Sequence, residues 1–181
     1  MLAILSANIQ GLTSARSKHK LGVLSEKAED ENIAIVTLTE SHLNQFFLEA
    51  EVGMTGFETY RADRATGTRK GGVVTFLRND VNPGVETLVS GSTGNIEYQA
   101  LKIPKLKILY IAVYRPPTAE LAHFVQVLQS LRRTIDEVEG AMPNIVFTGD
   151  LNFPMIQWED TTIKGGCCQQ QDQAKLLLDF F

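Results

Sequence analysis

The sequence predicts an α/β fold in which sheets pack on each other and helices cover the outside. Short apolar runs rich in β-branched residues recur along the chain and predict buried strands. Stretches near the start, in the third quarter and at the end show apolar residues at helical spacing. Several strands follow one another without a helix between them, which argues against a strictly alternating, doubly wound sheet.

The N-terminal half is expected to hold one helix among several strands. The strands are expected at residues 2–7, 33–38, 57–61 and 71–77. The run at 33–38 is continuously apolar and β-branched, which is typical of a strand buried on both faces. The helix is expected over residues 17–31, because apolar side chains recur there on one face and the opposite face is polar. Gly71 and Gly72 open the last of these strands and favour close packing there.

The C-terminal half is expected to add further strands and two helices. The strands are expected at residues 85–89, 96–103, 106–114 and 144–148, with a turn at 91–95. Residues 121–138 form a clear amphipathic helix, with Thr118 as its expected N-cap. A last helical stretch is expected over residues 169–178. At 181 residues, the whole chain 1–181 is expected to be a single domain.

Composition and charge exclude several classes of protein. The net charge of −4 argues against coating nucleic acid through bulk charge, but it is compatible with a metal site, which needs carboxylates. No apolar run approaches the ~20 residues of a membrane span, and no membrane association is expected. Cys167 and Cys168 are adjacent, so they form no disulfide framework and favour a reducing, intracellular setting.

Polar residues with useful chemistry follow four of the expected strands. Asp150 and Asn152 lie two residues apart in NIVFTGDLNFP, just past a strand end, where ligands bind in open α/β sheets. Asn8, Glu40 and Tyr114 end three other strands. Each residue alone is more often a solvated loop residue, a turn former or packing at a strand end. Their coincidence predicts a common site.

This set of residues suits metal-assisted attack of water on a phosphate ester. Glu40 is a hard oxygen ligand suited to Mg²⁺, and Asn8 either adds its carbonyl oxygen or orients Glu40. Asp150 can position or deprotonate the attacking water. Asn152 and Tyr114 can donate hydrogen bonds to the non-bridging phosphate oxygens, while a metal would stabilise the leaving oxygen.

Basic residues are candidates for contacts with nucleic acid. Arg64, Arg69 and Lys70 lie in a basic stretch, for which the alternative is a solvated loop. Arg115 follows Tyr114 directly and is a candidate phosphate contact, with a surface ion pair as the alternative.

In combination, these motifs resemble the endonuclease/exonuclease/phosphatase superfamily, and more narrowly the apurinic-type endonuclease domains of non-LTR (LINE-like) retrotransposons. The matching segments occur in the order of the family and cover the whole chain. They are SANIQGL around Asn8, LTESHL around Glu40, RKGGVVTFLRNDV at 69–81, IAVYRPP around Tyr114 and TGDLNFPMIQWED at 148–160.

The resemblance implies a four-layer α/β/β/α sandwich and a Mg²⁺-dependent phosphodiesterase, with Mn²⁺ as an alternative ion. It implies an enzyme that nicks DNA so that a reverse transcriptase can prime there. DNA, a C-terminal reverse transcriptase domain in the intact protein and a nuclear location follow from the same resemblance. By position, Asn8 and Glu40 match the metal-site pair, Tyr114 the phosphate-facing tyrosine, and Asp150 and Asn152 the pair that handles water and phosphate.

The chain departs from the family at its C-terminal end. The family carries a late Ser-Asp-His segment, whereas the histidines here are His19, His42 and His123, none in that context. The chain ends in a helix at LLLDFF, where the family continues into further strands. The final strands are therefore expected to be missing, and activity is expected to be weak or absent. The alternatives are a non-catalytic remnant that still binds nucleic acid or metal, and a phosphatase or phosphodiesterase of the superfamily with another substrate.

Overall fold

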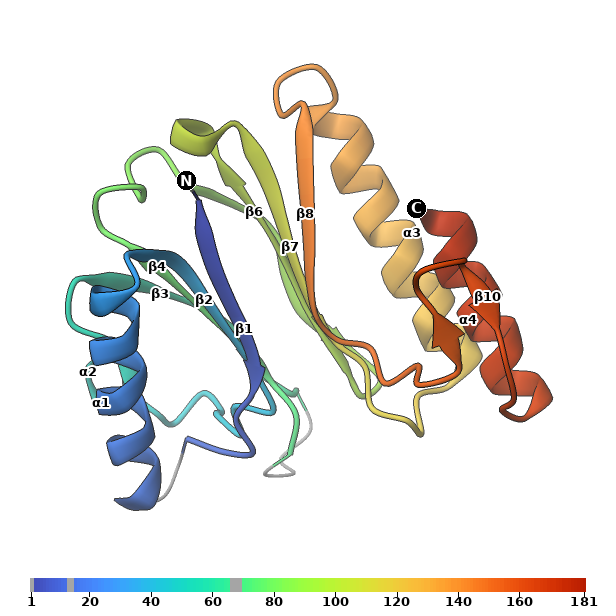
Figure 1. Cartoon of the computed structure of the whole chain (residues 1–181), viewed down its shortest axis with the longest axis horizontal. Helices are drawn as coiled ribbons and strands as arrows, with labels where there is room; N and C mark the ends of the chain where they lie inside the picture. The colour runs from blue at the N-terminus through green and yellow to red at the C-terminus, as the bar shows by residue number, and fades with distance from the viewer. Residues whose placement is uncertain (1, 13–14, 66–69) are drawn as a thin grey trace.

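Two facing sheets with helices on their outer sides form the molecule (Figure 1). A computed structural model describes residues 2–12, 15–65 and 70–181. The arrangement confirms the expected α/β sandwich of two packed mixed sheets. Among the described residues, no helix is long and apolar enough to cross a membrane.

The first sheet has the strand order β1-β2-β4-β3. Its strands are β1 (Ala3–Asn8), β2 (Ile33–Thr39), β3 (Phe57–Ala62) and β4 (Val73–Arg78). β1 runs parallel to β2, and β4 runs antiparallel to both β2 and β3. The helix α1 (Ala15–Asp30) covers the outer face of this sheet, and the short helix α2 (Glu49–Val52) lies on the same side (Figure 1).

The second sheet follows sequence order, β5-β6-β7-β8. Its strands are β5 (Glu86–Thr93), β6 (Ile96–Ile103), β7 (Ile108–Tyr114) and β8 (Asn144–Asp150). The first three are antiparallel neighbours, whereas β8 runs parallel to β7 because α3 (Leu121–Val138) makes the crossover between them. The helices α3 and α4 (Cys168–Phe180) cover the outer face (Figure 1).

Alternating side chains on the central strands divide the apolar core into three layers. On β7, Tyr110 and Ala112 face the first sheet, whereas Leu109 and Ile111 face α3. A separate cluster lies between the first sheet and α1. Every residue of β2 and β7 is buried, because each of these strands is covered on both faces. This explains why both read as continuous apolar runs.

Several local expectations need correction. Gly71 and Gly72 precede β4 instead of opening it, and residues 91–93 of the expected turn belong to β5. The N-cap of α3 is Glu120, without a side-chain hydrogen bond, because the helix begins at Leu121 and Thr118 lies too early to cap it. Short elements had no periodic signal and were not expected. They are α2, the 3₁₀ turn Pro104–Leu106, and the hairpin of β9 (Ile156–Gln157) and β10 (Thr162–Ile163).

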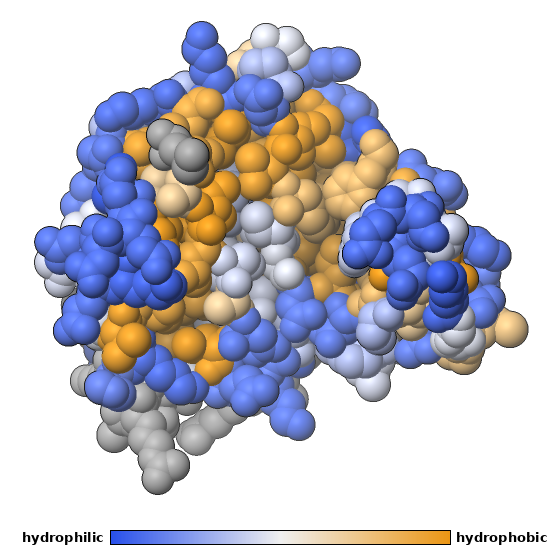
Figure 2. Space-filling model, viewed as in Figure 1, coloured by the Kyte–Doolittle hydropathy of each residue, from blue (hydrophilic) through white to orange (hydrophobic). Residues whose placement is uncertain are grey.

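The sandwich is open along one side. β1 and β8 are the terminal strands of their sheets and pair on one side only, among the described residues. Figure 2, in the same view as Figure 1, shows apolar surface gathered between the two helical flanks. Ile145 on β8 is 49% exposed and Leu2 beside β1 is 38% exposed. A free strand edge beside apolar surface can pair with another chain.

Candidate active site

The predicted site residues meet at one end of the sandwich. In the first sheet, parallel pairing sets Asn8 of β1 beside Thr39 of β2, directly before Glu40. In the second sheet, parallel pairing sets Tyr114 of β7 beside Asp150 of β8. Because parallel strands end at the same edge, and because the two sheets face each other, these strand ends converge.

Asn8 links the two acidic residues of the cluster. Its side-chain nitrogen donates to Oε1 of Glu40 at 2.9 Å and to Oδ2 of Asp150 at 3.0 Å. Its carbonyl oxygen accepts from the Gln10 backbone N–H at 3.2 Å. These hydrogen bonds are the contacts that the orienting role expected for Asn8 requires. The amide holds two carboxylates close together without adding charge.

Tyr114 completes the link between the sheets. Its hydroxyl donates to Oε1 of Glu40 at 3.1 Å. Burial and the adjacent Glu40 carboxylate raise the pKa of Tyr114 well above its ordinary value. The phenol therefore stays protonated across the physiological range and remains a hydrogen-bond donor.

The loop after β8 holds Asn152 next to Asp150. The Asn152 backbone N–H donates to Oδ1 of Asp150 at 3.1 Å, and its side-chain nitrogen donates to the Arg115 carbonyl at 2.9 Å. One of the two amide hydrogens is thus committed, and the other is available to a ligand. A cavity of about 430 Å³ runs along residues 149–154 and Trp158, so both side chains border open space.

Three non-glycine residues of the site have a left-handed backbone conformation. Glu40, His42 and Asn152 have φ angles of 53°, 57° and 51°. This conformation is uncommon for Glu, whereas Asn and His adopt it more readily. The turn also brings Nε2 of His42 within 3.7 Å of Oε2 of Glu40. The sequence signal for this approach is the spacing, since His42 follows Glu40 by two residues.

Arg64 is held inside the protein. It pairs with the fully buried Glu97 at 2.9 Å, and its guanidinium lies 6.0 Å from the centre of the Tyr114 ring. Glu97 also accepts from the Gly72 backbone N–H at 2.9 Å. A direct phosphate contact by Arg64 therefore competes with a buried ion pair. The sequence signal for this buried ion pair is the position of Glu97, a charged residue inside the apolar strand IEYQALKI.

The other candidate nucleic-acid contacts differ among themselves. Lys70 is exposed, as a contact residue would be, whereas Arg69 lies outside the described residues. Arg115 is only 1% exposed and donates to Gln173 Oε1 and to the Leu151 carbonyl. The expected phosphate contact by Arg115 does not agree with this burial: its guanidinium is turned into the core.

The donor set of the cluster fits a hard divalent cation. Mg²⁺ is usually held by one or two carboxylates together with water and substrate phosphate oxygens. Glu40 is partly exposed and Asp150 lies on the other side of the shared Asn8 amide. In the described part of the chain, no group of three His, Cys, Asp or Glu side chains forms a ready cage for a metal. A cation here would therefore rely on Glu40 and on oxygens from water and substrate.

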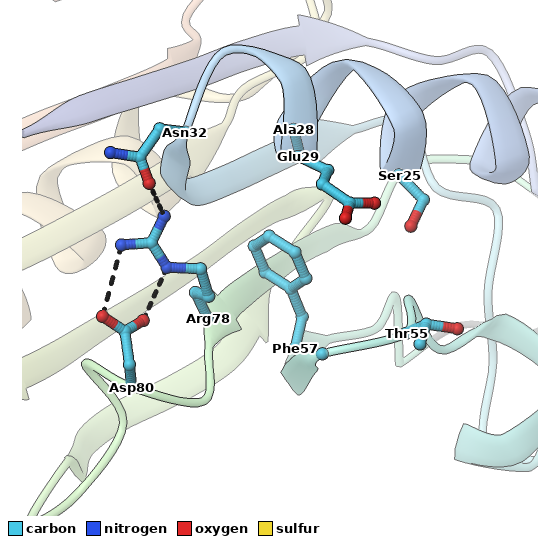
Figure 3. A pocket seen from close by; sticks show the side chains of 9 residues that line it. Ser25, Ala28, Glu29, Asn32, Thr55, Phe57, Arg78 and Asp80 are labelled. Atoms are coloured by element: carbon cyan, nitrogen blue, oxygen red, sulfur yellow. Dashed lines mark hydrogen bonds and ion pairs between the residues drawn. The ribbon is translucent and has the colours of Figure 1, made fainter.

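A second cavity of about 560 Å³ lies at the opposite end of the first sheet (Figure 3). Residues from α1, β3 and β4 line it, with Glu29 and Phe57 on its walls. Arg78 donates to the carboxylate of Asp80 and to Oδ1 of Asn32, so its charge is neutralised within the protein. This cavity shares no lining residue with the cluster at the strand ends.

The chain belongs to the endonuclease/exonuclease/phosphatase family. The sequence model of that family matches residues 5–166, which include every member of the cluster. Enzymes of the family generally use divalent metal ions. No curated protein matches the chain by sequence.

Solved structures share the fold at low sequence identity. The 3′ phosphatase NExo from Neisseria, bound to a product DNA hairpin, matches with a TM-score of 0.67 and 18% identity over 99% of this chain and 71% of its own. The AP endonuclease LMAP from Leishmania major matches with a TM-score of 0.66 and 15% identity, covering 98% and 65%. A mannosyl-6-phosphatase from Bacteroides thetaiotaomicron gives 0.55 and 16%, covering 84% and 66%. The chain thus spans about two thirds of these proteins.

Proposed function

We propose that this chain is a Mg²⁺-dependent phosphodiesterase domain that nicks DNA and derives from a non-LTR retrotransposon. The observation that carries the proposal is the hydrogen-bonded cluster of Asn8, Glu40, Tyr114 and Asp150, which comes from the ends of strands in both sheets. Two carboxylates, a neutral orienting amide and a protonated phenol can supply the base, the metal ligand and the hydrogen-bond donors for hydrolysis of a phosphate ester.

Each residue of the cluster has a role in this chemistry. Asp150 accepts the proton of the attacking water, while Asn8 holds its carboxylate in place. When substrate is bound, the Tyr114 hydroxyl would turn from Glu40 to a non-bridging oxygen, and the free amide hydrogen of Asn152 would donate to another, where negative charge grows in the transition state. Glu40 would hold the cation, which supplies Lewis-acid stabilisation of the phosphate and the leaving oxygen.

DNA is the substrate that best fits the comparisons and the sequence. The Neisseria neighbour is a 3′ phosphatase bound to product DNA, and two further neighbours are AP endonucleases. The segments VYRPP and TGDLNFPMIQW support the retrotransposon group within the family. On this proposal the intact protein also carries a reverse transcriptase and acts in the nucleus.

Nicking of supercoiled plasmid by pure residues 1–181 tests the proposal. We expect slow Mg²⁺-dependent conversion to the open circle, stopped by EDTA and reduced at least about 100-fold in Glu40→Gln and Asp150→Asn. Glu29→Gln is the matched control, because Glu29 lines the distant cavity. Nicking that survives Glu40→Gln, or that Glu29→Gln removes equally, would contradict the proposed site.

Two alternatives have specific support. The lack of a Ser-Asp-His context around His19, His42 or His123 favours a non-catalytic module that binds metal or nucleic acid. Metal binding by calorimetry without turnover would select this alternative. The similarity to a mannosyl-6-phosphatase favours a phosphatase with another substrate. A panel of plasmid, abasic duplex, poly(A), sugar phosphates and inositol phosphates separates it from a DNA endonuclease.

A further inference from the structure

Arg115 is a buried cation without an ion-pair partner among the residues that the structure describes. Its Nε donates to Oε1 of Gln173 at 2.9 Å, and its Nη1 donates to the Leu151 carbonyl at 3.0 Å. Its guanidinium carbon lies 4.1 Å from the ring centre of Phe153 and 5.6 Å from that of Phe124. Neutral oxygens and aromatic faces thus surround the charge.

Packing alone does not explain an arginine at this position. Burial lowers the pKa of Arg115 to about 10, so the side chain stays charged at neutral pH. A methionine could fill the space between the two phenylalanine rings without the desolvation penalty of a buried charge. The position therefore favours arginine for its directed hydrogen bonds, which join the loop after β8 to Gln173 of α4.

Arg115 contacts three consecutive residues of that loop. Its backbone N–H donates to the Asp150 carbonyl at 2.9 Å, and its side chain donates to the Leu151 carbonyl. Its own carbonyl accepts from the Asn152 side chain at 2.9 Å. Peptide groups are planar, so a fixed Leu151 carbonyl constrains the backbone on both sides of it. The orientations of Asp150 and Asn152 are thereby coupled to Arg115.

Gln173 holds Arg115 from the other side. This residue of α4 is completely buried, and its Nε2 donates to the Ala119 carbonyl at 2.9 Å. Its Oε1 accepts from both Nε and Nη2 of Arg115. The chain of contacts therefore runs from the segment after β7, through α4, to the loop that carries Asp150.

We propose that Arg115 and Gln173 are positioning residues that set the orientation of Asp150 and Asn152 toward the phosphate. The inference rests on the proposed function for the identity of the reaction. A displacement of about 1 Å in such a group can lower the rate about 10²-fold. The effect should fall on kcat, because neither Arg115 nor Gln173 touches the substrate.

Two variants test the positioning role in the full chain. Arg115→Met and Gln173→Leu should each lower kcat about 100-fold with KM within about twofold of the wild type. In both, hydrogen exchange of residues 149–155 should speed up more than exchange in the first sheet, which also reports the overall loss of stability caused by an unpaired buried group. Arg132→Met is the matched control, because Arg132 also donates to a carbonyl and lies over a ring, both of Phe180, away from the site. It should change neither readout.

Conservative substitutions at the same two positions test whether the hydrogen bonds restore the rate. Gln173→Glu keeps an acceptor oxygen for Arg115 and should retain kcat within about tenfold, whereas Arg115→Lys loses the planar fork and should not. If Arg115→Met fails to fold, the kinetics and hydrogen exchange of Gln173→Leu alone test the positioning role. Wild-type kcat and exchange in Gln173→Leu would overturn the proposal. A wild type without turnover refutes the proposed function alone, and faster exchange of the loop in the variants would still support positioning.

Discussion

The phenolic oxygen of Tyr114 lies 3.1 Å from Oε1 of Glu40. This hydrogen bond joins the last residue of β7 to the residue directly after β2, and it crosses from one sheet to the other. The relative position of the two groups therefore depends on how the sheets pack. The site can assemble only when both sheets are in place.

Tyr114→Phe should reduce turnover with little effect on stability or substrate binding. The variant removes the hydroxyl that, on the proposed function, turns from Glu40 to the phosphate, and losing one such donor typically costs about 100-fold in kcat. Steady-state kinetics should show this loss with KM nearly unchanged. Tyr60→Phe is the control, because Tyr60 donates to Asn82 at 2.6 Å away from the cluster. Equal losses in the two variants would contradict a specific role for Tyr114.

Stability should fall as the pH rises above about 10. Burial raises the pKa of Tyr110, and burial with Glu40 raises that of Tyr114. The unfolded chain therefore loses these protons at lower pH than the native chain, so the stabilisation is present below pH ~10 and lost above it. Urea unfolding between pH 8 and 11 measures how steeply the free energy of unfolding falls with pH.

Tyr110→Phe isolates one contribution to that slope. The Tyr110 hydroxyl lies 2.7 Å from that of Thr37 and accepts from Thr148 at 3.1 Å. Removing it should cost about 1–3 kcal/mol at pH 8, because buried hydroxyls lose a partner. Above pH 10 the free energy of unfolding of the variant should fall less steeply with pH than that of the wild type. An unchanged slope would be inconsistent with a raised pKa of Tyr110.

Gly149→Ala should disrupt the strand pairing beside the site. Gly149 has φ +123°, and a Cβ there would lie 1.9 Å from the Val113 carbonyl oxygen. Gly140 has φ +83° with no atom within 4 Å of the equivalent position. We expect a loss of about 3 kcal/mol or more at Gly149 and about 1 kcal/mol at Gly140→Ala. Chemical denaturation measures the free energy of unfolding of both variants. Similar losses would show that the positive φ angle, and not the contact with Val113, causes the destabilisation.

Ile145→Lys should reduce self-association without lowering stability. Ile145 is 49% exposed on the free edge of β8, and a lysine at a strand edge disfavours pairing with another chain. Sedimentation at rising concentration should show less oligomer, with a change in unfolding free energy within about 0.5 kcal/mol. Val23→Lys is the control, since Val23 is equally exposed on α1. If Val23→Lys has the same effect, added charge and not the edge is responsible.

Local patterns in the sequence were sufficient to predict the positions of the longer helices and strands. The bounds expected for β6 and α3, Ile96–Ile103 and Leu121–Val138, agree with the structure. Their apolar periodicity is long enough to distinguish strand from helix. The hairpin of β9 and β10 and the helix α2 were missed, because two to four residues carry no period.

The sequence by itself also determined which residues form the cluster. Asn8, Glu40, Tyr114 and Asp150 each follow or end a strand, and parallel strands end at a common edge. Only the tertiary structure decided the partner of each polar atom. It turned Arg115 into the core, where sequence position had suggested a phosphate contact. The reason is physical: a side chain's direction depends on neighbours from other strands and helices, and their packing is absent from any local pattern.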